Sequence, residues 1–141
     1  MNKADLKTEV CSTKNFELVK KYIAEFELDD RQLKQNEFLT VSDDKGLLGF
    51  GRLREYSDFT EFCSLGIITH ERSKGLGKHL CEVLIKKAPN SIYIVCVIPS
   101  YFVPMGFEIC TEYPEEILDK LKYCNNSLCV EEGYVVMRKL K

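Results

Sequence analysis

Residues 61–78 read EFCSLGIITHERSKGLGK, and this stretch joins two different hydrophobic patterns through a charged loop. Residues 61–69 are rich in apolar and β-branched side chains, which is typical of a strand. Residues 78–88 place apolar side chains on one face at helical spacing, with lysines and a glutamate on the other. The loop at residues 70–77 carries the glycines. The stretch therefore predicts a strand–loop–helix unit.

The two glycines of this loop, Gly75 and Gly77, stand where the helix is expected to begin. Glycine leaves room for a ligand to approach the backbone N–H groups, and a helix N-terminus adds about half a positive charge. Together they form a site suited to a phosphate group. Arg72, Lys74 and Lys78 would add charged hydrogen-bond donors around it. The alternative interpretation is a tight turn that holds no ligand.

Two other phosphate-binding loops do not fit the sequence. A dinucleotide fingerprint needs a third glycine where this chain has Leu80, and no segment matches the GxxxxGK[ST] pattern of a P-loop. A nucleotide-phosphate enzyme is therefore disfavoured. Gly49 and Gly51 lie within a predicted strand, where glycine marks a bulge or a close backbone contact.

The rest of the chain predicts a mixed sheet covered by helices. The crossover from residues 61–69 to residues 92–98 is right-handed by default, so these two strands should be parallel. The earlier strands should form an antiparallel meander. The other expected elements are helices at 16–26, 29–35, 99–106 and 114–124, and strands at 38–41, 47–56, 107–110 and 133–140, with Asp29 or Asp30 as an N-cap and Gly106 as a C-cap.

Composition narrows the class of protein. The 141 residues suit one domain spanning 1–141, and the net charge of −2 argues against a nucleic-acid or membrane-surface binder. The apolar runs are too short to cross a membrane, and the first residues do not resemble a secretory signal. The seven cysteines are an odd number without a CxxC pair, which indicates a reducing cytoplasm. No metal site is expected, because His70 has no second ligand nearby and Cys124 and Cys129 lack two more at zinc spacing.

The pattern Arg72-x-x-Gly75-x-Gly77 resembles the pyrophosphate-binding motif Q/R-x-x-G-x-G/A of the GNAT N-acetyltransferases. The flanking order of strand, helix, apolar strand and short helix also matches, and Gly106-Phe107 resembles the family's second motif. The resemblance covers at least residues 38–107. It implies the GNAT fold, an α/β fold with a central, mostly antiparallel sheet, one splayed parallel strand pair and flanking helices. The segment from Gly106 onward is similar to short N-acetylglutamate-synthase-like members.

The resemblance implies that acetyl-CoA is the cofactor and that an acetyl group passes directly to a primary amine of a small molecule, an amino acid or a protein. The backbone of residues 65–67 would hold the pantetheine and the thioester carbonyl, and residues 72–78 the pyrophosphate. In full, the residues so assigned to cofactor binding are Leu65, Gly66, Ile67, Arg72, Ser73, Lys74, Gly75, Leu76, Gly77, Lys78 and Phe102. Plain core packing is the alternative for Leu65 and Ile67.

Two residues are candidates for catalysis. Glu61 lies eleven positions before Arg72, an offset that resembles the catalytic glutamate of histone-type members, so Glu61 is the candidate general base. An exposed glutamate at a strand start is the alternative. The family's tyrosine acid falls on Phe102, a departure from the pattern, and the adjacent Tyr101 would point about 100° away on a helix. Either Tyr101 is the acid or the enzyme has none.

Other interpretations remain open at the level of sequence. A catalytically silent domain that binds acyl-CoA, as a sensor or within an assembly, would carry the same cofactor loop. Arg52 and Arg54 share one strand face and could clamp an acceptor carboxylate or form a solvated strip. A strand near either terminus could pair between subunits in a homodimer.

Overall fold

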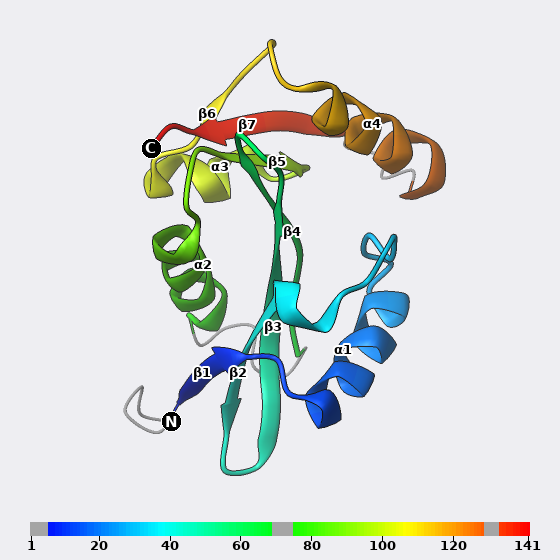
Figure 1. Ribbon diagram of the computed structural model, residues 1–141, viewed down its shortest axis with the longest axis vertical. Helices are drawn as coiled ribbons and strands as arrows, with labels where there is room; N and C mark the ends of the chain where they lie inside the picture. The colour runs from blue at the N-terminus through cyan, green and yellow to red at the C-terminus, as the bar shows by residue number, and fades with distance from the viewer. Residues whose placement is uncertain (1–5, 69–74, 129–132) are drawn as a thin grey trace. The chain divides into compact units, whose positions relative to one another are not determined.

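The computed structural model describes residues 6–68, 75–128 and 133–141 of the chain. Figure 1 shows the elements in order. The strands are β1 (Lys7–Val10), β2 (Phe38–Asp43), β3 (Gly46–Glu55), β4 (Thr60–Ile67), β5 (Ile92–Cys96), β6 (Glu108–Ile109) and β7 (Val135–Lys139). The helices are α1 (Thr13–Glu25), α2 (Leu76–Lys87), α3 (Pro99–Phe102) and α4 (Glu115–Tyr123), with short 3-10 helices at Gln35–Glu37 and Val103–Met105 and a π-helical turn at Cys124–Leu128.

The strands form a mostly antiparallel sheet in the order β1-β2-β3-β4-β5-β7-β6. Within the described part of the chain, β4 and β5 are the one parallel pair, as the crossover argument predicts. By their internal packing the residues fall into two units, Met1–Leu53 with Ser64–Lys87, and Arg54–Cys63 with Ala88–Lys141. Both β3 and β4 contribute residues to each unit.

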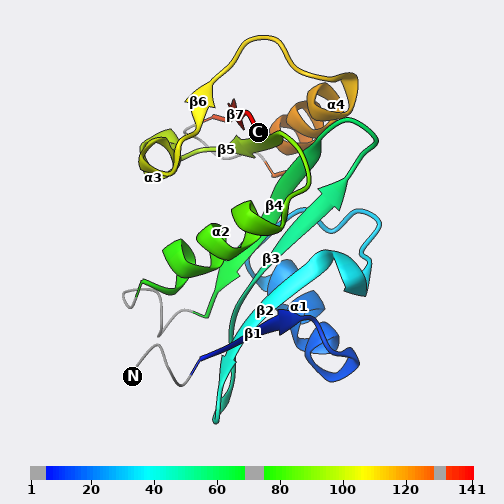
Figure 2. The same cartoon turned by 60° about the vertical axis from the view of Figure 1, so that its left-hand side comes forward.

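In the first unit, α1 and α2 flank the strands on opposite sides (Figure 1). The side chain of Ser12 caps α1 by accepting from the Asn15 amide, which explains why the helix begins before residue 16. An apolar cluster under α1 contains Cys11, Val19, Ile23, Phe38 and Phe50. Figure 2 shows β1, β2 and β3 side by side, with α2 crossing in front.

The expected second helix at residues 29–35 is absent, so that prediction is wrong. Asp29 accepts hydrogen bonds from the backbone amide of Arg31 and from its guanidinium, and Gln32 has a φ of 50°. The backbone carbonyls of Arg31 and Gln32 accept from the guanidinium of Arg52 at 3.0 and 2.6 Å. A buried arginine therefore holds this segment in an irregular conformation, which sequence periodicity does not reveal.

The glycines of β3 allow close packing in the first unit, as predicted. A Cβ atom at Gly51 would lie 2.5 Å from Leu84 Cδ1 of α2, and one at Gly49 would lie 2.6 Å from Ile67 Cδ1 of β4. Side chains at these positions would push α2 and β4 away from β3. The two glycines therefore let β3 approach its neighbours in this unit.

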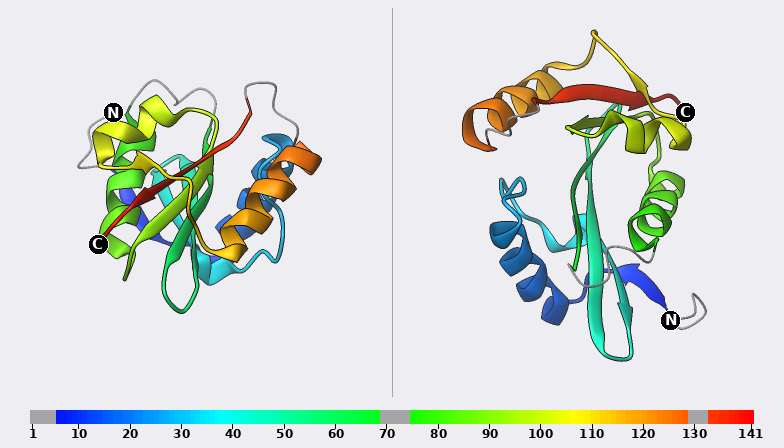
Figure 3. Two further views of the ribbon diagram at one scale, coloured as in Figure 1. Left: turned by 90° about the horizontal axis from the view of Figure 1, so that it is seen from above. Right: turned by 180° about the vertical axis from the view of Figure 1, so that it is seen from behind.

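In the second unit, α3 and α4 lie on either side of β5 and β7 (Figure 3, left). An apolar cluster beneath α4 contains Phe59, Ile117 and Val136, with Tyr93 and Leu121 packed against it. Gly106 ends the segment after α3 with a φ of 95°, the left-handed conformation expected of a C-cap. The predicted helix at 114–124 is present as α4, which begins after Pro114.

Candidate functional site

Gly75 and the first turn of α2 have the geometry that an anion site needs. Gly75 has a φ of 73°, and a Cβ atom built on it would meet no heavy atom of the described residues within 4 Å. Leu76 is buried, so only its main chain could reach a ligand, whereas Lys78 is exposed. Because α2 begins at Leu76, its unsatisfied N–H groups and its dipole favour a negative charge at this end. Arg72, Ser73 and Lys74 lie outside the described residues.

His79 on the first turn of α2 has a hydrogen-bond partner within the first unit. Its Nε2 atom lies 3.1 Å from Oγ1 of Thr8, and its backbone amide donates to Gly75 O at 3.2 Å. These contacts tie the start of α2 to β1, a strand that the sequence did not predict. His79 therefore acts here as an anchor of the helix terminus.

Residues 65–67 of β4 are packed tightly within the first unit. A Cβ atom at Gly66 would overlap the ring of Phe50, so only glycine fits this position. Leu65 and Ile67 are half-buried, and Leu65 Cδ1 would lie 3.5 Å from a Cβ at Gly51. Both side chains therefore pack only in part within the first unit.

The parallel pairing of β4 with β5 is short. The register joins Thr60 to Ile92 and Glu61 to Tyr93, and the described residues of β4 after Glu61 have no partner on β5. Ser64, three residues further along β4, has a φ of 53°, which is rare for a residue other than glycine within a strand. The two strands are thus hydrogen-bonded only at their N-terminal ends, as the splayed pair of the predicted fold requires.

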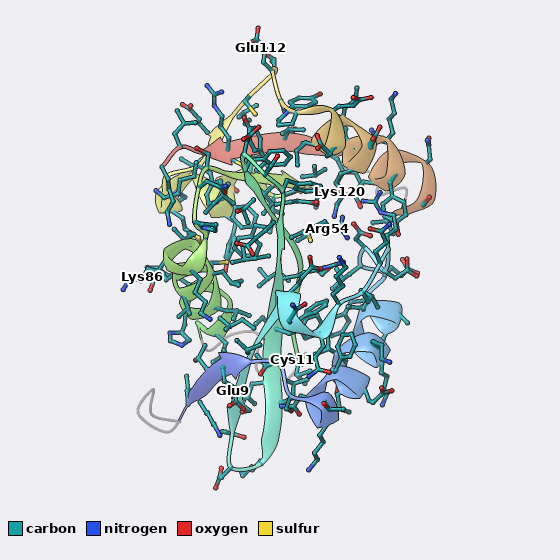
Figure 4. All side chains as sticks on the ribbon, viewed as in Figure 1. Glu9, Cys11, Arg54, Lys86, Glu112 and Lys120 are labelled. Carbon is teal, nitrogen blue, oxygen red and sulfur yellow. The ribbon has the colours of Figure 1, made fainter. Side chains whose placement is uncertain are left out.

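Glu61 lies at the centre of a buried charge cluster in the second unit. Its side chain is 0% exposed, so the alternative of an exposed glutamate at a strand start is wrong. Its Oε1 atom lies 3.3 Å from Nη1 of Arg54, and its Oε2 atom lies 3.0 Å from Nζ of Lys120. Figure 4 shows the labelled side chains of Arg54 and Lys120 near one another. Each carboxylate oxygen therefore faces a cation.

Tyr56 belongs to the same cluster. Burial raises the pKa of the Tyr56 phenol and the negative charge of Glu61 raises it further, while a hydrogen bond with Arg54 opposes them. The ring of Tyr56 stacks on Phe59, with centroids 4.7 Å apart. The tyrosine therefore stays a neutral hydroxyl beside the charged groups.

Tyr101 and Phe102 point in different directions, as their spacing on a helix predicts. Phe102 is only 4% exposed and its ring packs edge-on against Phe62 and Phe107. Tyr101 is 37% exposed, and its ring stands at 86° to that of Phe102. Phe102 is therefore a core residue of the second unit, and Tyr101 carries the phenol that solvent can reach.

Arg52 and Arg54 do not form a solvated strip, which corrects that interpretation. The Arg52 side chain is buried and contacts Glu37 and two backbone carbonyls in the first unit. Arg54 is paired with Glu61 in the second unit. The third member of that ion cluster, Lys120, was missed by sequence reasoning. Its signal is that a lysine interrupts the apolar face formed by Ile117 and Leu121.

Two searches of the described residues, for metal-ligating groups and for membrane-spanning helices, returned none. No group of three or more histidine, cysteine, aspartate or glutamate side chains in residues 6–68, 75–128 and 133–141 could hold a metal ion. Across the same residues, no helix combines the length and apolar character that crossing a bilayer demands. Cys129 lies outside the described residues.

Several solved structures share this fold. N-acetylglutamate synthase from Neisseria gonorrhoeae, complexed with coenzyme A and N-acetyl-glutamate, aligns with a TM-score of 0.78 and 16% identity over 99% of this chain and 36% of that one. Rv2747 from Mycobacterium tuberculosis, in complex with CoA and NLQ, aligns with a TM-score of 0.76 and 14% identity over 96% of this chain and 99% of that one. A putative acyl-CoA N-acyltransferase from Klebsiella pneumoniae aligns with a TM-score of 0.67 and 17% identity over 96% of this chain and 95% of that one.

These identities are low, so the alignments establish the fold alone. The chain spans about a third of the length of the Neisseria gonorrhoeae synthase. A search of curated proteins found no match to the sequence. The model of the acetyltransferase (GNAT) family matches residues 6–101, which is more than half of the chain. The chain therefore belongs to the GNAT acetyltransferase family.

Proposed function

We propose that residues 1–141 act as one catalytic domain that binds acetyl-CoA and transfers its acetyl group directly to a primary amine in a ternary complex. The observation that carries this proposal is the family match over residues 6–101, which includes the loop that opens α2. Acetyl-CoA would supply the acetyl group as an activated thioester. The residues of this chain would supply the binding and the proton transfers.

The residues present fit a diphosphate group. The open space beside Gly75 and the N-terminus of α2 would let the main-chain amides of Gly75, Leu76, Gly77 and Lys78 face the anion. Arg72, Ser73 and Lys74 complete the motif in the sequence. We assign the pantetheine arm to the main chain of Leu65, Gly66 and Ile67. Phe102, the remaining residue that we assign to the cofactor, has an enclosed ring in the second unit.

The amine must lose a proton before it attacks the thioester. A lysine-like ammonium with a pKa of about 10.4 is neutral at pH 7 at a cost of roughly 4.6 kcal/mol. We assign the role of general base to Glu61. Because its carboxylate is fully enclosed, Glu61 would take the proton through an intervening water molecule rather than from the amine itself. Main-chain N–H groups of β4 would stabilise the oxyanion.

The thiolate that leaves must gain a proton. We assign this role to Tyr101, which lies on α3 and is 37% exposed. Phe102, at the position of the family's tyrosine, has no hydroxyl. Since a thiol with a pKa of about 8.5 is a fair leaving group, the contribution of Tyr101 would be modest.

A second candidate function is a catalytically silent module that binds acyl-CoA. Two observations favour it: the carboxylate of Glu61 has no exposed surface, and Phe102 stands where the family's acid is expected. The binding loop would be the same in both cases. Only turnover separates the two functions.

For the acceptor, we propose an amino acid. This is supported by the structural similarity to proteins whose complexes contain N-acetyl-glutamate in one case and NLQ in the other. Small diamines and peptide amines are the alternative acceptors. Each class can be tested with the same assay.

The experiment is a thiol-release assay with acetyl-CoA and a panel of amino acids, diamines and peptides, in which mass spectrometry identifies the acetylated product. The proposal expects release of CoA that depends on the acceptor. It also expects a product that is heavier than the acceptor by one acetyl group, about 42 Da. Binding of CoA without release on any acceptor would support the silent module. Absence of CoA binding would exclude both functions.

A further inference from the structure

Lys120 is a buried charge on a helix that otherwise packs through apolar residues. On α4, Ile117 belongs to the apolar cluster with Phe59, and Leu121 packs against that cluster. Lys120 lies on the same side of the helix, its side chain is 5% exposed, and its Nζ atom lies 3.0 Å from Oε2 of Glu61. Lysine is rarely buried to this extent without a specific partner.

Stability does not explain this choice of residue. Removing two charges from water is costly, and replacing a buried ion pair with apolar residues of similar volume is often neutral or stabilising. A leucine or methionine at position 120 would extend the apolar face of α4. The lysine is therefore better explained by what it does to Glu61.

The groups that face Glu61 come from several elements. Arg54 lies at the end of β3, Tyr56 follows β3, Lys120 comes from α4, and Tyr93 is the register partner on β5. Of these, Arg54 and Lys120 carry charge opposite to that of the carboxylate, and both lie within 4 Å of it. Two charged donors, one at each oxygen, can hold a carboxylate in one orientation. The shorter contact is the one with Lys120.

We propose that Lys120 is a positioning residue that holds the Glu61 carboxylate in a fixed orientation, so that Glu61 can accept a proton during acetyl transfer. The inference rests on the proposed function. It assigns Lys120 no contact with the substrate. Because Lys120 lies on α4, the packing of this helix in the second unit is linked to the orientation of the Glu61 carboxylate.

The proposal predicts a loss of turnover without a loss of cofactor affinity. Lys120→Met removes the closer of the two cations that contact the carboxylate among the described residues, so the orientation of Glu61 is no longer fixed. The turnover number at neutral pH should fall, and the KM for acetyl-CoA should stay near that of the wild type. Lys120→Arg keeps the charge and should restore most of the turnover.

The experiment measures kcat and KM from thiol release for the wild type, Lys120→Met, Lys120→Arg and Lys122→Met. Lys122 is exposed on the same helix and provides the matched control. A fall in kcat with an unchanged KM for acetyl-CoA, rescued by Lys120→Arg, is the result that the proposal expects. Circular dichroism checks that each variant folds.

A double-variant cycle keeps the test decisive if Lys120→Met folds poorly. Adding Lys120→Met to Glu61→Gln removes both charges, which should restore folding, and should cause little further loss of activity because the partner is already gone. An unchanged kcat in folded Lys120→Met, or equal losses in both backgrounds, would overturn the role of Lys120. A wild-type protein that transfers no acetyl group would instead overturn the proposed function, and the inference with it.

Discussion

Replacing Arg52 by methionine should destabilise the first unit strongly. Arg52 is among the fully buried side chains, and its guanidinium donates to Glu37 Oε1 at 2.9 and 2.7 Å and to the carbonyls of Arg31 and Gln32 at 3.0 and 2.6 Å. Methionine would fill most of the volume but would leave the carboxylate and two carbonyls without these donors.

The size of the effect follows from which partners are left behind. Removing one member of a buried ion pair costs about 3–5 kcal/mol. The Glu37 side chain is 16% exposed, so water can solvate part of the carboxylate, which places the expected loss nearer to about 3 kcal/mol. A native protein has roughly 5–15 kcal/mol of stability in total, so this loss is large.

The assay is urea unfolding followed by circular dichroism, with Lys14→Met as an exposed control from the same unit. Arg52→Met combined with Glu37→Gln should be less destabilised than the sum of the single variants, because the uncompensated charge is gone. A loss below about 1 kcal/mol for Arg52→Met would refute the reasoning, since exposed substitutions cause changes of that order.

Two further predictions concern reactivity. Tyr101→Phe should lower kcat by about tenfold, which is less than the roughly 10²–10⁴-fold typical of general acid–base catalysis because a thiol leaves readily. The affinity for CoA, measured by calorimetry, should be unchanged, and an unaltered kcat would remove Tyr101 from the mechanism. Burial raises the pKa of the Cys11 thiol from 9.0 to about 11 and that of the Cys81 thiol to about 12. Both thiols are therefore protonated in the folded protein at neutral pH. The stability linked to these protons is lost only as the pH rises above 9.0 through the two raised values. At pH 8 only about one Cys11 thiol in a thousand would be ionised. Iodoacetamide should therefore label Cys11 and Cys81 slowly until urea unfolds the chain, which mass spectrometry can follow. Rapid labelling of the folded protein would contradict the burial of these thiols.

The parts of the fold that were predictable from sequence are those fixed by local pattern. The strand before Gly75 and the helix after it each carry a strong pattern, and the handedness of the crossover predicts the parallel pairing of β4 with β5. Gly106 marked a helix end because few other residues adopt a positive φ.

The parts that were not predictable depend on contacts between distant residues. β1 is a four-residue edge strand whose sequence KTEV has no distinctive pattern, and it is defined by pairing with β2. The irregular segment near Arg31 is shaped by the guanidinium of Arg52, which lies about twenty residues further on. The burial of Lys120 depends on Glu61, a residue 59 positions earlier in the chain.

For the candidate site, the sequence pointed to Glu61 and to the α2 loop but not to the environment of either. Burial of Glu61 between Arg54 and Lys120 changes how it could act, from a base that touches the amine to one that works through water. Local sequence could not show this, because the two cations come from β3 and α4. The identity of the surrounding charges is a property of the folded second unit.

The central claim is that main-chain amides at the start of α2 bind the diphosphate of acetyl-CoA. Titration calorimetry with CoA tests it most directly on the wild type, Gly77→Glu and Lys86→Glu, the last being an exposed position on the final turn of the same helix. We expect the wild type and Lys86→Glu to bind with similar affinity, and Gly77→Glu to show no measurable binding, because it places bulk and negative charge at the anion site. Equal affinity in all three proteins would contradict the claim.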